Sequence, residues 1–207
     1  MRGKVICILC LLFLMHIFIP IQVFAEDRGK VILILMDRVS WHDIEKADTP
    51  AIDALVEMGS IGLMTTNTGG SLSQVNAYTT LGAGAKAVGV SGSQMAFSYG
   101  ENFEGGTTEE VYKQRSGYIM EPGSIANLSI AQLYRNNSNH KYTVSIGALG
   151  TALKEAGLKV AVIGNCDTPK LEESGYNIKR YLVSMMMDNQ GIVPMGEVGE
   201  SILIHDS

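Results

Sequence analysis

The chain has 207 residues, 46% of them hydrophobic, and carries 21 acidic against 16 basic residues, a formal net charge of −5. This length suffices for one domain with a substantial hydrophobic core. The acidic balance, without a basic cluster, argues against binding to a nucleic-acid duplex, which requires positive charge to neutralise phosphates.

Residues 1–25 have the pattern of a secretory signal peptide. Arg2 and Lys4 precede an apolar run over 5–19, and Val23-Phe24-Ala25 provides small or tolerated residues where signal peptidase cuts. We therefore expect this segment to be removed after export. An uncleaved anchor is the alternative, in which the segment is the chain's membrane contact, but the apolar run is short for a span.

Removal of the signal leaves 14 basic and 21 acidic residues, a net charge of −7, and Cys166 as the one cysteine. A single cysteine forms no internal disulfide, so we expect Cys166 to be a small buried residue. An exported chain without disulfides suggests a bacterial protein, and we expect it to be secreted or held in the cell envelope.

The first predicted strand covers 30–36 and ends at Asp37. Its run of branched apolar residues is typical of a strand buried on both faces of a parallel sheet. Open α/β sheets bind ligands at the carboxyl ends of their strands, where a carboxylate can hold a metal ion. On the strand alone, a helix cap or a solvated loop acid is an equal interpretation of Asp37.

Helices and strands alternate through the rest of the chain. Pro50 opens a helix after Thr49 and Gly59 ends it. Further elements are predicted at 61–65 (strand), 75–83 (helix, after a Gly-rich loop), 145–156 (helix) and 159–164 (strand), with a hairpin turn at 188–191 and a lid-like excursion near 98–140. This alternation predicts an α/β fold with a mostly parallel sheet flanked by helices.

Ser73 stands where the Gly-rich loop enters its helix. The free N–H groups and the dipole of a helix N-terminus hold negative charge, so a hydroxyl there is well placed to attack an anion. A coordinated metal lowers the pKa of such a hydroxyl. Ser71 is the alternative nucleophile, and an ordinary N-cap role is the commoner fate of a serine at this position.

The apolar strand ending in Asp37, the segment Ala47–Leu55 and the Ser73, Asn76, Tyr78 spacing resemble the alkaline phosphatase superfamily, including its nucleotide pyrophosphatase/phosphodiesterase and phosphoglycerate mutase branches. The resemblance implies that Asp37 and Ser73 bind a divalent metal, zinc or alternatively manganese. It further implies that Ser73 is the nucleophile and that Asn76 binds a phosphoryl oxygen. The similarity covers residues 30–90 well and 145–170 loosely.

The superfamily completes its metal sites with Asp and His residues that this sequence lacks, since its four histidines form no Asp-x-x-x-His or Asp-His pair. We expect 26–207 to be the N-terminal portion of an alkaline phosphatase-like catalytic domain, inactive alone. When complete, it would be an exported hydrolase of phosphate mono- or diesters. The alternative is a non-catalytic cell-envelope binding protein on a degenerate scaffold.

Overall fold

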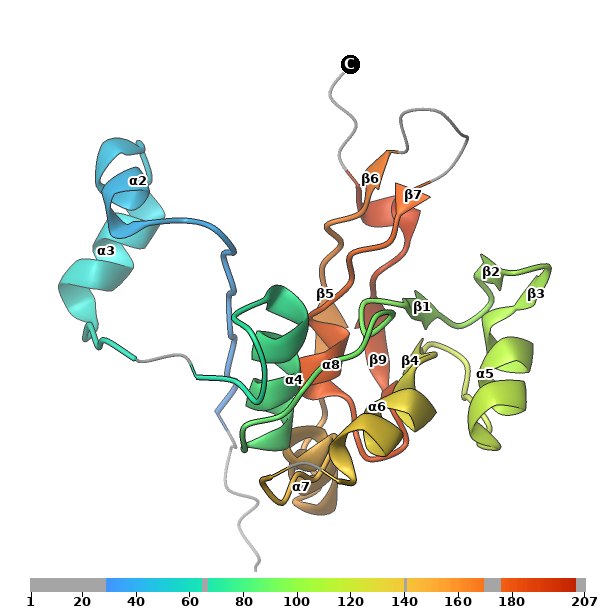
Figure 1. Cartoon of the computed structure of the whole chain (residues 1–207). Coiled ribbons are helices and arrows are strands. Elements are labelled where there is room, and N and C mark those ends of the chain that lie inside the picture. Colours follow the sequence, from blue (N-terminus) through green and yellow to red (C-terminus); the bar gives the residue numbers. More distant parts are fainter. Residues whose placement is uncertain (1–28, 65–66, 140, 170–175, 204–207) are drawn as a thin grey trace, which may run out of the picture. The chain divides into compact units, whose positions relative to one another are not determined.

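The computed structural model describes residues 29–64, 67–139, 141–169 and 176–203 (Figure 1). The predicted signal peptide, residues 1–25, lies outside them. Contacts divide the chain into two compact units, with the boundary between Gly62 and Leu63. Each unit is therefore described by itself.

The described part of the first unit contains the helices α2 (Trp41–Lys46) and α3 (Pro50–Met58). Ser40 starts α2 with a capping box, since its backbone N–H donates to Asp43 Oδ2 at 2.8 Å and its hydroxyl accepts from Asp43 N. The predicted start of α3 at Pro50 and its end before Gly59 are both confirmed. Thr49 occupies the N-cap position without making a side-chain cap bond.

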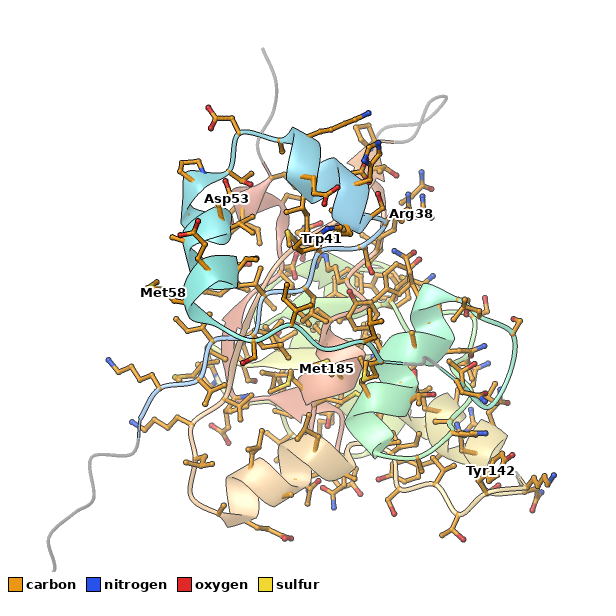
Figure 2. All side chains as sticks on the ribbon, turned by 90° about the vertical axis from the view of Figure 1, so that its left-hand side faces the viewer. Arg38, Trp41, Asp53, Met58, Tyr142 and Met185 are labelled. Carbon is orange, nitrogen blue, oxygen red and sulfur yellow. The ribbon has the colours of Figure 1, made fainter. Side chains whose placement is uncertain are left out.

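The run 31–36, predicted as a buried strand, is assigned no strand, and Val31 and Ile32 are 94% and 84% exposed. Helix α3 likewise buries no residue, and Met58 on it is 80% exposed (Figure 2). An apolar run becomes a buried strand only where other strands and helices cover it. The described part of this unit offers two short helices and no strand.

The second unit contains nine short strands among its described residues. They are β1 (Ala96–Ser98), β2 (Asn102–Phe103), β3 (Gly106–Thr107), β4 (Ile125–Asn127), β5 (Ala161–Ile163), β6 (Thr168–Pro169), β7 (Tyr176–Asn177), β8 (Ile192–Val193) and β9 (Met195–Glu197). Strands β1, β4 and β8 form an antiparallel sheet, and β2–β3 and β6–β7 are antiparallel pairs. Strands β5 and β9 pair in parallel. The mixed α/β class is confirmed, whereas these pairings do not show a mostly parallel sheet.

The second unit also contains five α-helices and one 3₁₀ helix among its described residues. They are α4 (Gln74–Ala83), α5 (Thr108–Ser116), α6 (Ile130–Asn137), α7 (Ala148–Glu155), α8 (Val183–Met186) and the 3₁₀ helix η1 (Glu200–Ile202). The predicted helices at 75–83 and 145–156 correspond to α4 and α7. The range predicted as an excursion, 98–140, holds the β2–β3 hairpin, α5, β4 and α6. None of the described helices is long and apolar enough to cross a membrane.

The core of the second unit is built from α5, α6, α8 and the antiparallel sheet. Its fully buried side chains include Tyr112, Ile125, Leu133, Val183 and Val193. Two glycines let helices approach α8 closely: a Cβ on Gly82 of α4 or on Gly150 of α7 would lie 2.3–2.5 Å from carbonyl oxygens of α8 and Met187. The close contact at Gly82 is therefore with a helix.

Candidate functional site

Ser73 is the N-cap residue of α4. Its backbone is extended (φ −150°, ψ 158°), and its hydroxyl oxygen accepts a hydrogen bond from Asn76 N at 3.3 Å. The residue is exposed, whereas α4 buries Asn76, Tyr78 and Thr79. The structure thus presents the Ser73 hydroxyl to solvent at the positive end of a ten-residue helix.

Asn76 fixes the loop that carries Ser73. Its side chain is buried, with the residue 7% exposed, and both polar atoms bind backbone. Nδ2 donates to Ser71 O at 2.7 Å, and Oδ1 accepts from Gly89 N at 2.7 Å. The carboxamide therefore joins the loop before α4 to a segment thirteen residues further along the chain.

The glycines of this loop allow its backbone to lie close to neighbouring residues. Gly69 N donates to Ala87 O at 2.9 Å, and a Cβ on Gly69 would lie 2.8–2.9 Å from backbone atoms of Lys86 and Ala87. A Cβ on Gly70 would lie 2.9 Å from Asn76 Nδ2. The Thr68 hydroxyl completes the turn by donating to Gly70 O at 2.9 Å. Side chains at the two glycines would displace the loop from its supports.

Asp37 lies in the first unit, in an exposed turn with Arg38, whose φ is +57°. The structure therefore brings Ser73 and Asn76 together within the second unit and describes Asp37 separately. Among the described residues, no group of three or more His, Cys, Asp or Glu side chains is arranged to hold a metal ion. A tetrahedral zinc site uses three or four protein ligands, so Asp37 and Ser73 alone do not complete one.

A buried ionic network joins the segments that follow β1, β5 and β7. Arg180 is 2% exposed; its Nε donates to Asp167 Oδ2 at 2.9 Å, and its Nη1 donates to Glu101 Oε2 at 2.8 Å. Asp167 Oδ1 also accepts from Lys179 N at 2.6 Å. The Asp167 N–H is bound by Asn165 Oδ1 at 2.6 Å. The Asp167 carboxylate therefore joins its turn to Lys179 and Arg180.

Glu101 is the member of this network in which the cost of burying the charge exceeds the stabilisation by its partners. Burial raises the pKa of its carboxyl, and the nearby Glu197 carboxylate acts in the same direction, against the opposing effects of Arg180 and of the Ser98 N–H. Ser98 also donates through its hydroxyl to Glu197 Oε1 at 3.1 Å. One guanidinium thus serves the carboxylates of Glu101 and Asp167 directly, and Glu197 adds further negative charge.

Cys166 is exposed, so its predicted burial is wrong. It lies between two residues whose side chains form hydrogen bonds with backbone groups. Asn165 Nδ2 donates to Val198 O at 2.7 Å, and the Asp167 carboxylate accepts from Lys179 N. With both neighbours directed to these partners, the chain leaves Cys166 at the surface.

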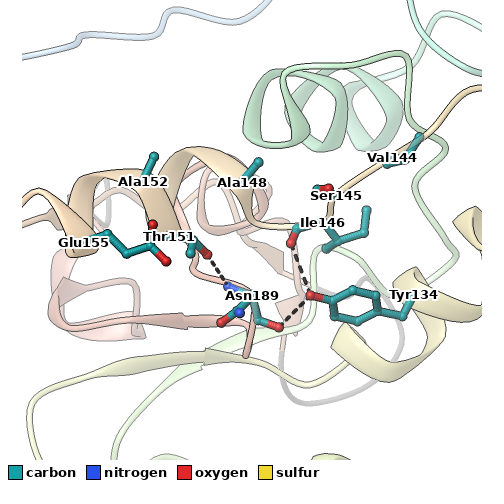
Figure 3. Close-up of a pocket in the computed structure, with 9 residues that line it drawn as sticks. All are labelled: Tyr134, Val144, Ser145, Ile146, Ala148, Thr151, Ala152, Glu155 and Asn189. Atoms are coloured by element: carbon teal, nitrogen blue, oxygen red, sulfur yellow. Dashed lines mark hydrogen bonds between the residues drawn. The ribbon is translucent and has the colours of Figure 1, made fainter.

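A surface pocket of about 430 Å³ is lined by residues of α6, of α7 with the segment 144–146 before it, and of the turn at Asn189 (Figure 3). The Tyr134 hydroxyl is directed at Asn189 O, 2.9 Å away, and at Ile146 O, 3.3 Å away. Thr151 Oγ1 accepts from Asn189 N at 2.9 Å. Burial raises the pKa of Tyr134. These groups hold the turn, and Ser73 and Asn76 are not among the residues that line the pocket.

Ser73 and Asn76 were predicted as site residues from the sequence, but the groups that hold them in place were not. Gly89 and Asn137 contribute through hydrogen bonds at sequence separations of 13 and 49 residues, and no local pattern signals either of them. Comparisons with protein-family models, with curated proteins and with solved structures find no match.

Replacement of Arg180 by methionine should destabilise the protein strongly. The substitution leaves Asp167 buried without its counter-ion, which typically costs about 3–5 kcal/mol. Urea unfolding of Arg180→Met against the unmodified chain measures this loss. Arg135→Met is the matched control, because Arg135 is exposed on α6 and should lose less than about 1 kcal/mol. Equal stabilities of the two variants would contradict the assigned role of the network.

Replacement of Glu101 by glutamine should change how stability depends on pH. Because the pKa of Glu101 is raised on folding, the native state binds more protons than the unfolded state above the ordinary pKa of 4.5. The unmodified chain should therefore lose stability relative to Glu101→Gln as pH rises from 4.5 through the raised pKa. Urea unfolding of both proteins between pH 4 and 8 measures the difference, and a difference that grows in the opposite direction would refute the raised pKa.

Proposed function

We propose that the chain carries the nucleophile of an exported, metal-dependent hydrolase of phosphate mono- or diesters related to the alkaline phosphatase superfamily. The observation that supports this most is the exposed Ser73 hydroxyl at the N-terminus of α4, on a loop fixed by a buried carboxamide. The proposal takes the parallel β5–β9 pair as part of the mostly parallel sheet of that superfamily.

In the proposed reaction, the Ser73 oxygen attacks phosphorus. The new O–P bond forms as the ester P–O bond breaks, the hydroxyl loses its proton, and the alcohol departs with a proton. Water then cleaves the phosphoserine, which releases phosphate or a phosphomonoester and restores Ser73. The helix N-terminus stabilises the negative phosphoryl group throughout.

The metal in this proposal is zinc, or alternatively manganese, held by Asp37 and Ser73 together with further ligands. When bound, it would supply positive charge to the phosphoryl oxygens and lower the pKa of the serine hydroxyl. Asn76 is proposed to donate to a phosphoryl oxygen. Its Nδ2 carries two hydrogens, and Ser71 O accepts one, so the other is the donor this role requires.

Export is part of the same proposal, with residues 1–25 as a cleaved signal and a bacterial envelope or the medium as the destination. The second candidate function is a non-catalytic envelope protein that binds its ligand on this scaffold. It is favoured by the absence of a complete metal-ligand group among the described residues. Turnover of a phosphate ester by the native protein would decide for the enzyme.

Ser73→Ala should lower kcat for an aryl phosphate ester by at least about a thousandfold, as removal of a catalytic nucleophile does. Ser71→Ala is the matched control, since Ser71 contributes its backbone oxygen to Asn76 and should stay within about tenfold of the unmodified enzyme. Steady-state kinetics of both variants, produced in the native host, measure these changes in kcat. A larger loss in Ser71→Ala than in Ser73→Ala would move the nucleophile to Ser71.

Asp37→Asn should weaken metal binding at least about tenfold, because a neutral amide replaces an anionic ligand and even supporting groups cost that much. Isothermal titration of the native protein with zinc measures the affinity. Asp53→Asn is the control, because Asp53 is an exposed acid on α3 of the same unit (Figure 2). Equal zinc affinities of the two variants would remove Asp37 from the proposed site.

A further inference from the structure

Asn137, the last residue of α6, is buried and holds a distant piece of backbone. The residue is 4% exposed. Its Oδ1 accepts from Val88 N at 2.9 Å, and its Nδ2 donates to Val88 O at 2.7 Å. The second Nδ2 hydrogen goes to Leu133 O at 2.9 Å, which anchors the carboxamide on its own helix. Asn137 thus satisfies both backbone groups of Val88, as a neighbouring strand would.

The next residue along the chain, Gly89, is held by the second buried carboxamide. Gly89 N donates to Asn76 Oδ1, and Asn76 Nδ2 donates to Ser71 O, two residues before Ser73. A continuous set of hydrogen bonds therefore runs from α6 through Val88–Gly89 to the loop that presents Ser73.

This connection has little room to adjust. A Cβ on Gly89 would lie 2.1 Å from Val75 Cγ1 and 2.8 Å from Val75 O, so the Val88–Gly89 backbone packs directly on the first turn of α4. Displacement of this segment would take with it the group that binds Asn76, and the loop before Ser73 would lose its support.

We propose that Asn137 is a positioning residue for Ser73: its carboxamide fixes Val88–Gly89, and Asn76 transmits that placement to the loop at the N-terminus of α4. The role of Ser73 as a nucleophile rests on the proposed function. The hydrogen-bonded link from Asn137 to the loop does not, and it can be measured without substrate.

The test uses Asn137→Asp, with Asn136→Ala as the matched control because Asn136 is the exposed neighbour on the same helix. Above its pKa the introduced carboxylate still accepts from Val88 N but cannot donate to Val88 O. Below its pKa it donates again. Burial beside the carbonyl oxygens of Leu133 and Val88 should raise that pKa well above 4.

Residue-resolved hydrogen exchange of the full chain should show the protection factor of Gly89 N reduced about tenfold in Asn137→Asp at pH 8, the effect of one lost hydrogen bond. Protection should return toward the unmodified value at pH 5. Leu128 N, which donates to Met95 O in the core, should be unaffected and reports global unfolding. Full protection at pH 8, no recovery at pH 5, or an equal loss at Leu128 would each overturn the proposal.

The unmodified chain gives a second measurement that needs no variant to fold. Val88 N and Gly89 N should exchange with one common protection factor, because one opening event frees both, and clearly different values would overturn the coupling. In the native protein, Asn137→Asp should lower kcat about tenfold at pH 8 and leave KM unchanged. If exchange behaves as expected while Ser73→Ala retains full turnover, the positioning role stands and the proposed nucleophile fails.

Discussion

The candidate site depends on the two hydrogen bonds of the Asn76 carboxamide. It lies buried between two stretches of backbone, with Ser71 O on one side and Gly89 N on the other. An amide suits this place because it offers a donor and an acceptor in one rigid plane, whereas a carboxylate offers acceptors alone. Without it, Gly89 N would lose its acceptor, and Ser71 O would keep only the Thr68 hydroxyl as a donor. The loop that carries Ser73 would then lose its link to Gly89.

The second unit contains a second fixed point of a different kind. Arg180, which follows β7, joins Asp167, which precedes β6, to Glu101, which lies between β1 and β2. Buried ion pairs of this type add little net stability, because desolvation offsets attraction, but their loss leaves charges without partners. The network therefore specifies how these segments meet, and Glu101 makes that arrangement sensitive to pH through its raised pKa.

Local signals in the sequence predicted what local physics controls. Pro50 and Gly59 bound α3 as expected, since proline and glycine act through their own backbone preferences. Ser73 caps α4 because its hydroxyl accepts the nearby Asn76 N–H. Burial was predicted less well: the run from Val31 and the side chain of Cys166 are exposed, because burial depends on residues distant in sequence. The supports of the site, Gly89 and Asn137, carry no local signal at all.

The central claim is that Ser73 attacks phosphorus, and covalent trapping tests it most directly. Native protein is mixed with an aryl phosphate ester, quenched in acid within milliseconds, digested and mapped by mass spectrometry. The account predicts a phosphoryl or phosphodiester adduct on the Ser73 side chain, absent in Ser73→Ala. An adduct on Ser71, or rapid ester turnover with no adduct on any serine of the loop before α4, would contradict it.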